Sequence, residues 1–134
     1  MSDNPNAIIE RLRSSCDCQT ALYTKMHDVT QRIVSQLVLS KGDLQRARQN
    51  FEEKQKLWDE IVARRLQAEP DTALWQQQKH LFSVQYDVGS LEASFDRMSK
   101  IIERYLSSED QLKRYLEHLC DQGSTIVQGG AHGV

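Results

Sequence analysis

Residues 88–119 read VGSLEASFDRMSKIIERYLSSEDQLKRYLEHL and carry the clearest structural pattern in the chain. Apolar or aromatic residues recur there at alternating steps of three and four, the spacing of a heptad seam on an α-helix. The seam consists of Val88, Leu91, Phe95, Met98, Ile102, Tyr105, Leu112, Leu116 and Leu119, with Glu109 as its one polar exception. We therefore predict a long helix over about residues 72–121, and Glu109, just after Ser107-Ser108, is where a kink would fall.

The segment Ala68-Glu69-Pro70-Asp71-Thr72 stands immediately before that helix. Proline disfavours helical geometry in the residue before it, so Pro70 predicts that Glu69 leaves the helix. Asp71 or Thr72 then supplies a cap for the next helix. We predict a turn over residues 68–72.

Residues 6–67 show a second helical pattern, and Gly42 lies in the middle of it. A glycine inside a helix costs only about 1 kcal/mol, and the apolar seam continues in phase from Leu37 to Leu44. We therefore favour one long helix over about residues 6–67. In the alternative, Gly42 ends one helix and Asp43 caps the next.

The expected fold is all-α. Residues 1–5 form a frayed start, residues 6–121 a long antiparallel two-helix coiled-coil hairpin, and residues 122–134 a Gly-rich flexible tail. The two helices would be roughly 90 Å and 75 Å long. If the chain breaks at Gly42, the alternative is a three-helix bundle.

Composition argues against several functions. Hydrophobic residues make up 39% and charged residues 27% of the chain, which suits long helices with one apolar seam. The net charge is −2, and the most basic window, Lys41 to Arg65, is nearly neutralised by its own acids, so we expect no nucleic-acid partner. No run of about 18 apolar residues occurs, and residues 1–5 lack the features of a signal peptide. We expect a cytoplasmic protein without membrane insertion.

The chain offers few groups arranged for chemistry. Cys16, Cys18 and Cys120 are an odd number of cysteines, which fits a reducing compartment. In a hairpin turning near residue 70, His118 and Cys120 would lie opposite residues 20–22, but cysteines two apart on a helix point to opposite sides. We therefore expect free thiols and no metal, with a Cys18–Cys120 disulfide as a minor alternative.

The remaining motifs point the same way. His27, His80, His118 and His132 are scattered, and no phosphate-binding loop or nucleophile motif is present. A thin rod also has no interior for a substrate pocket. We expect neither an enzyme nor a cofactor.

Aromatic residues gather near the predicted tip of the hairpin. Trp58 precedes the turn, and Trp75 and Phe82 follow it beside or outside the seam. Exposed aromatics at a rod's tip would anchor a partner, so the predicted partner-binding residues are Trp75, Leu81, Phe82 and Val88. In the alternative, the aromatics widen the core or cover Trp58.

The sequence LWQQQKHLF at residues 74–82, after the turn at Pro70, and the charged patch QNFEEKQK at residues 49–56 carry a family resemblance. With the hairpin pattern of residues 6–120, the chain resembles the central-stalk proteins of flagellar and type III secretion export, the FliJ/YscO-like family.

That resemblance implies a non-catalytic stalk that links an export ATPase ring to an export gate at the inner membrane. Leu81, Phe82 and Val88 would face the gate, and the segments from Arg11 to Leu22 and from Leu112 to Leu119 would face the ATPase. The chain departs from the family in being less basic, with its net charge of −2.

Three hypotheses follow. The first is this stalk. The second is a small helical secretion chaperone or adaptor that binds a client protein. The third is a coiled-coil subunit of a larger complex, in which the seam from Val88 to Leu119 pairs with another chain or forms a homodimer.

Overall fold

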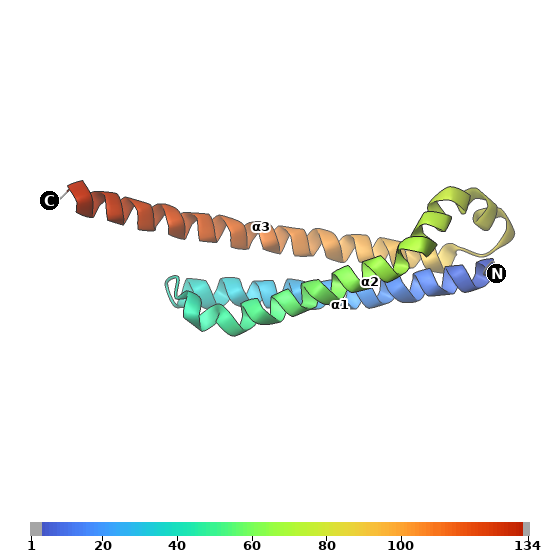
Figure 1. Cartoon of the computed structure of the whole chain (residues 1–134), viewed down its shortest axis with the longest axis horizontal. Coiled ribbons are helices and arrows are strands. Elements are labelled where there is room, and N and C mark those ends of the chain that lie inside the picture. The colour runs from blue at the N-terminus through green and yellow to red at the C-terminus, as the bar shows by residue number, and fades with distance from the viewer. Residues whose placement is uncertain (1–3, 133–134) are drawn as a thin grey trace.

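The computed structural model describes the backbone of residues 4–132 and the side chains of residues 4–84 and 86–121. It contains three helices, α1 (Pro5–Leu39), α2 (Leu44–Gln85) and α3 (Gly89–His132), arranged along one rod (Figure 1). No strand occurs among the described residues. The all-α prediction is confirmed, and the three helices fit the alternative of a three-helix fold. The favoured two-helix hairpin was wrong.

The chain breaks at Gly42, where we favoured a continuous helix. Lys41 has a φ of 57° and Gly42 a φ of 91°, and the Gly42 N–H donates to the Leu37 carbonyl at 2.8 Å. This is a helix cap that requires left-handed geometry, which glycine adopts most easily. Asp43 then accepts a hydrogen bond from the Gln45 N–H at 3.1 Å and caps α2.

The reversal at Gly42 buries the seam on both of its sides. Leu37 and Ala47, one from each helix, are both fully buried in the same apolar cluster. A seam that stays in phase across a glycine therefore fits two helices folded back on each other as well as one continuous helix.

The predicted turn over residues 68–72 does not exist, because α2 runs through Pro70 to Gln85. Tertiary contacts hold the helix together on the far side of the proline. Arg11 of α1 donates to both carboxylate oxygens of Asp71, at 2.9 and 2.8 Å. Trp75 and Phe82 are buried against α1 further along. These contacts offset the cost of a proline inside a helix, about 3 kcal/mol.

The second turn instead lies at residues 86–88. Before it, α2 departs from helical geometry at Gln78, with φ −119° and ψ 16°, and Figure 1 shows the end of α2 bending away from the rod. The Asp87 carboxylate then accepts a hydrogen bond from the Gly89 N–H at 3.0 Å, where α3 begins. Val88 occupies the cap position of α3, since its carbonyl accepts a hydrogen bond from the Glu92 N–H at 2.9 Å.

Helix α1 is the central helix. It packs against both α2 and α3, whereas the described parts of α2 and α3 nowhere bring their Cα atoms within 8 Å of each other. Arg11 pairs with Asp71, and Gln36 with Asn50, so α1 and α2 are antiparallel. His27 lies beside Ser108, and the Leu37 carbonyl accepts from Tyr115, so α1 and α3 are parallel.

This parallel arrangement corrects the expected position of Cys120. In a hairpin Cys120 would face the region of Cys16 and Cys18. In the structure Leu119 lies against Gly42, so Cys120 is at the opposite end of α1. The geometry therefore gives no support to a Cys18–Cys120 disulfide, and all three cysteines are free thiols.

Three apolar clusters succeed one another along the rod. The first joins the start of α1, the end of α2 and the start of α3, the second lies at mid-length, and the third is beside the α1–α2 turn. Their buried members are, in order, Ile8, Ile9, Leu12, Trp75, Phe82, Val88 and Leu91; Leu22, Tyr23, Met26, Val29, Leu57, Ile61 and Tyr105; and Ile33, Val34, Leu37, Ala47 and Leu112.

The α3 seam packs largely as its heptad pattern suggests. Leu91, Tyr105 and Leu112 are buried, and Phe95, Met98, Ile102, Leu116 and Leu119 are half-buried. α3 is continuous through Glu109, so the kink expected there is wrong. The helix is also described up to His132, past Asp121 where we expected it to end, and it extends beyond the α1–α2 turn (Figure 1).

Candidate functional site: an apolar groove between α2 and α3

The four predicted partner-binding residues do not share one exposed surface. Trp75, Phe82 and Val88 are buried, with Phe82 only 3% exposed, while Leu81 is 59% exposed. The Trp75 and Phe82 rings stack with centroids 5.9 Å apart, and Phe95 of α3 lies 6.0 Å from Trp75. Their positions match the alternative in which these aromatics widen the core at one end of the rod.

A different set of apolar side chains is exposed on α2. Trp58, Val62 and Leu66 are 37%, 38% and 63% exposed. Their spacing of four residues places them in one stripe along the helix. This stripe faces α3, because Val62 and Leu66 line a cavity together with Met98, and Trp58 lines another together with Tyr105.

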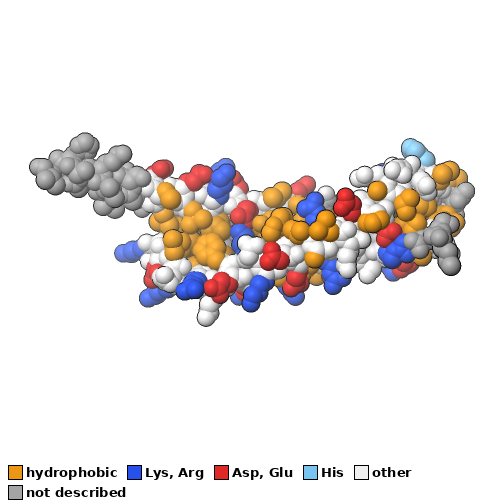
Figure 2. Space-filling view, in the orientation of Figure 1, with side chains coloured by type: hydrophobic (Ala, Val, Ile, Leu, Met, Phe, Trp, Pro, Cys, Tyr) orange, Lys and Arg blue, Asp and Glu red, His pale blue; other side chains and the backbone are white. Residues whose placement is uncertain are grey.

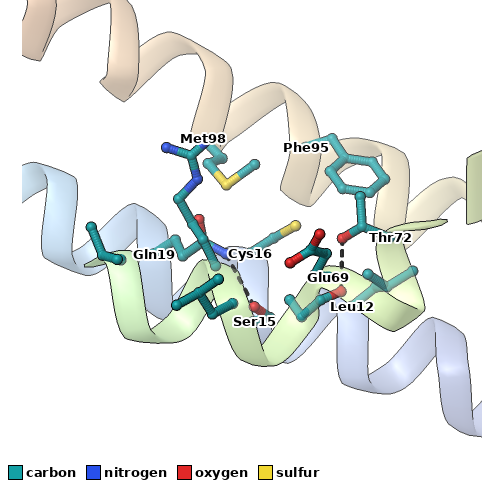
Figure 3. Close-up of a pocket in the computed structure, with 12 residues that line it drawn as sticks. Leu12, Ser15, Cys16, Gln19, Glu69, Thr72, Phe95 and Met98 are labelled. Carbon is teal, nitrogen blue, oxygen red and sulfur yellow. Dashed lines mark hydrogen bonds between the residues drawn. The ribbon is translucent and has the colours of Figure 1, made fainter. Parts of the chain in front are cut away.

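The first of these cavities has a volume of about 470 Å³ and reaches down to α1. Leu12 and Cys16 of α1 form its floor, and Phe95 and Met98 of α3 form the wall opposite α2. Figure 3 shows Cys16, Thr72, Phe95 and Met98 around this space. Each hydrogen bond between the lining residues joins two residues of the same helix; for example, Gln19 donates to Ser15 of α1 at 3.1 Å.

Two further hollows continue the same surface toward the α1–α2 turn. One, of about 320 Å³, is bounded by Met26, Phe51 and Trp58 among others. The other, of about 510 Å³, runs along α3 past Leu106, which is 56% exposed. Figure 2 shows hydrophobic side chains gathered in a strip between α2 and α3.

We call this strip the α2–α3 groove. Its α2 wall is Phe51, Trp58, Val62 and Leu66, its α3 wall is Phe95, Met98 and Leu106, and its floor is Leu12, Cys16 and Met26 of α1.

The groove is open because α2 and α3 each pack on α1 and stand apart from each other. Packed helices in bundles lie 8–10 Å apart axis to axis and bury an apolar stripe from every helix. Here α1 contacts both other helices, and Figure 1 shows α2 crossing α1 while α3 diverges from both toward the α1–α2 turn. The open side has the shape left by three helices of a four-helix bundle.

Polar contacts at mid-length fix α2 relative to α3, and α3 relative to α1. Lys54 of α2 forms an ion pair with Glu109 of α3, and Glu109 also accepts a hydrogen bond from Tyr105 at 3.0 Å. Burial, and then the nearby Glu109 charge, raise the pKa of Tyr105. On the other flank of α3, Ser108 Oγ lies 2.6 Å from His27 Nδ1 and accepts from Gln31 at 2.8 Å. If α2 or α3 packed in a shifted register, these groups would lose their hydrogen-bond partners, which is costly for buried polar atoms.

The cysteine in the groove floor behaves as a small apolar residue. Burial, and to a lesser extent the Asp17 charge, raise the pKa of Cys16 to about 11. Its thiol is therefore protonated at neutral pH and a weak nucleophile. Cys18 is half-buried and Cys120 exposed. Within the described residues no three His, Cys, Asp or Glu side chains converge as a metal site.

Sequence reasoning found part of this site. Trp58 was noted as an aromatic near a predicted tip, but Val62 and Leu66 were missed. The available signal was the spacing of four residues between Trp58, Val62 and Leu66, which puts them on a flank beside the buried Ala47 and Ile61 and the half-buried Lys54.

In the described part of the chain, no helix has both the length and the apolar character needed to cross a membrane. Comparison of the sequence and fold with protein-family models, curated proteins and solved structures yields no match. The geometry of the groove therefore carries the functional argument.

Proposed function

We propose that this chain is a protein-interaction module that acts by binding and not by catalysis, and that holds an amphipathic helix of a partner protein in the α2–α3 groove. The observation that carries the proposal is the exposed stripe of Trp58, Val62 and Leu66, which faces α3 across an open, apolar hollow. Exposed apolar stripes in a concave surface are typical of sites that take a helix.

The dimensions suit one helix. The α2 wall from Phe51 to Leu66 spans 16 residues, or about 24 Å of helix. A partner segment of four to five turns would cover it. An incoming helix would bury the apolar flanks of α2 and α3 as the fourth member of a bundle, and the tryptophan in the wall is of a type enriched in binding hot spots.

Among the hypotheses from sequence, this proposal is a form of the helical chaperone or adaptor that binds a client. The export-apparatus stalk was inferred from the resemblance of residues 49–56 and 74–82 and from an expected two-helix hairpin. Three helices replace that hairpin, and the stalk itself stays a prediction. The coiled-coil subunit hypothesis used the seam of α3, and much of that seam is covered by α1 within the chain.

The test places a photo-reactive amino acid at position 66 or at position 84, one at a time, in the full-length chain expressed in its own cells. Leu66 lies in the groove, whereas Val84 is a matched control, apolar, 86% exposed and outside the groove. We expect position 66 to cross-link to a helical segment of another protein and position 84 not to. Equal yields from both positions, or cross-links from position 66 only to a second copy of this chain, would overturn the proposal.

A further inference from the structure

The chemistry of the helix that fits the groove can be deduced from the charges along its edges, an inference that rests on the proposed function. α3 carries acids at a strict spacing of seven residues, Asp96, Glu103, Asp110 and Glu117. Seven residues are two helical turns, so these carboxylates form one line about 10 Å apart. Two of them, Asp110 and Glu117, line the hollow along α3 that contains Leu106 and continues the groove, and Asp96 and Glu103 extend the same line along the helix.

The α2 edge is acidic too. Glu52 and Asp59, again seven apart, lie on the line that continues to the exposed Leu66. Glu52 borders a hollow beside Phe51, and Glu69 lines the 470 Å³ cavity. Carboxylates of both helices therefore line the groove or the hollows beside it, at Glu52 and Glu69 of α2 and at Asp110 and Glu117 of α3.

Nearby cations offset only part of this charge. Arg48 pairs with Glu52 at 3.2 Å, Lys100 with Asp96 at 2.9 Å and Arg114 with Asp110 at 3.0 Å. Arg65 and Lys113 also border the groove.

Four of the edge carboxylates stand outside these pairs. In the described part of the chain, Glu103, Glu117, Asp59 and Glu69 have no ion-pair partner. The groove and the hollows beside it are lined by six carboxylates and four cations, an excess of two negative charges that equals the net charge of the whole chain.

We infer that the helix held in the groove carries Lys or Arg on both flanks of its apolar stripe, at the positions equivalent to e and g of a heptad. In bundles and coiled coils these flanking positions pair with charges on the neighbouring helices and decide which partner is accepted. A helix with acidic flanks would face like charges every second turn along α3, and again at Glu52 and Glu69 of α2, which disfavours it. The apolar stripe supplies the affinity, and the acidic edges select a basic helix.

The test uses three synthetic peptides of three heptads with identical Leu positions at a and d, and with Lys, Gln or Glu at every e and g position. Binding to the full chain is followed by the fluorescence anisotropy of the labelled peptide. We expect the Lys peptide to bind about tenfold or more tighter than the Glu peptide at low salt, with Gln between them. The difference should shrink at about 0.5 M salt, where exposed charges are screened.

A charge-reversed variant tests whether the preference for the Lys peptide comes from the carboxylates beside the groove or from the net charge of the chain. Glu103→Lys with Glu117→Lys should remove most of the preference for the Lys peptide. The matched control is Asp28→Lys with Glu60→Lys, which changes the net charge equally at exposed positions. Glu60 lies two residues from Trp58 and Val62, and Asp28 two from Met26, so both point away from the groove. The control should keep the preference.

The outcomes separate this inference from the proposed function. Equal binding of the three peptides, or a preference that the control pair also removes, would overturn the basic-helix inference and leave the groove as a helix site. Failure of all three peptides to bind would overturn both. A dimeric free chain whose dissociation is required for peptide binding would mean that a second copy fills the groove, which also overturns the inference.

Discussion

Trp75 and Phe82 show how much a single aromatic residue contributes to this fold. They stack with an interplanar angle of 7° inside the cluster that closes the end of the rod, against Ile8 and Ile9 of α1. Large aromatic side chains bury the most apolar surface of any residue and add a further ring–ring attraction. Both residues follow Pro70 and hold the second part of α2 on α1.

Phe82→Ala is therefore expected to lower the free energy of unfolding by about 3–5 kcal/mol, through lost burial and the cavity left behind. The measurement is urea unfolding followed by circular dichroism. Leu81→Ala is the control, because Leu81 is 59% exposed, and it should change stability by about 0.5 kcal/mol or less. If the two variants were equally stable, Phe82 would not be part of the core.

At position 42 the backbone conformation requires a glycine. Its φ of 91° is rarely adopted by other residues, and a Cβ there would lie 2.9 Å from the Leu119 side chain. Gly42→Ala should cost about 1–2 kcal/mol by thermal or urea unfolding. Gly89→Ala is the comparison: alanine favours the helix in which Gly89 lies, but its Cβ would lie 3.3 Å from the Asp87 carboxylate, so the net change should be within about 0.5 kcal/mol. Equal effects of the two substitutions would contradict the cap at Gly42.

At the scale of the helices, local sequence signals gave a mixed result. Asp43, the cap of the alternative fold, lies where capping preferences place it, whereas Asp71 and Thr72, expected to cap a new helix, lie inside α2. Pro70 was misjudged because its cost of about 3 kcal/mol is local. The ion pair and aromatic packing that offset this cost come from residues some sixty positions away in the chain, such as Arg11.

The same limit applies to the groove. Periodicity shows which flank of a helix is apolar, but whether that flank is covered depends on how the helices are arranged. In the predicted hairpin Trp58 would face the helix after Pro70, whereas in the structure it borders an open space beside Tyr105. The acids spaced seven residues apart on α3, from Asp96 to Glu117, can be read from the sequence. That they lie beside the α2–α3 groove follows only from the arrangement of the helices.

The link between Asp71 and Arg11 gives α2 a pH dependence. Hydrogen bonds from Arg11 hold the pKa of Asp71 below its ordinary value of 3.8, although partial burial opposes them. A carboxyl whose pKa is lower in the folded state stabilises the fold above its unfolded pKa. That stabilisation is lost as the pH falls through the folded value.

Asp71→Asn should therefore be less stable than the native chain at pH 7 by about 0.5–1 kcal/mol. The difference should decline once the pH falls below about 3.8 and vanish once Asp71 is protonated in the folded state. Urea unfolding of both proteins across this range is the measurement. A difference that persists unchanged in strong acid would mean that the charge of Asp71 does not contribute.

At the scale of the whole molecule, the fold has no single compact core. Three clusters lie in series along α1, and each draws on all three helices. Because α1 occupies the centre, α2 and α3 bury one flank each and leave a second flank partly exposed (Figures 1 and 2). The exposed flanks belong to one groove because Val62 and Leu66 of α2 line the same hollow as Phe95 and Met98 of α3.

The relative position of α2 and α3 is thus the central claim, and zero-length carbodiimide cross-linking of the unmodified chain tests it most directly. Lys54 of α2 forms an ion pair with Glu109 of α3, so mass spectrometry of the monomer should find an amide between these two side chains. In a two-helix hairpin turning at Pro70, Lys54 would instead face residue 86, sixteen positions beyond the turn. A link from Lys54 to Glu109 is the predicted result, and a link from Lys54 to Asp87 with none to Glu109 would contradict the three-helix fold and the groove with it.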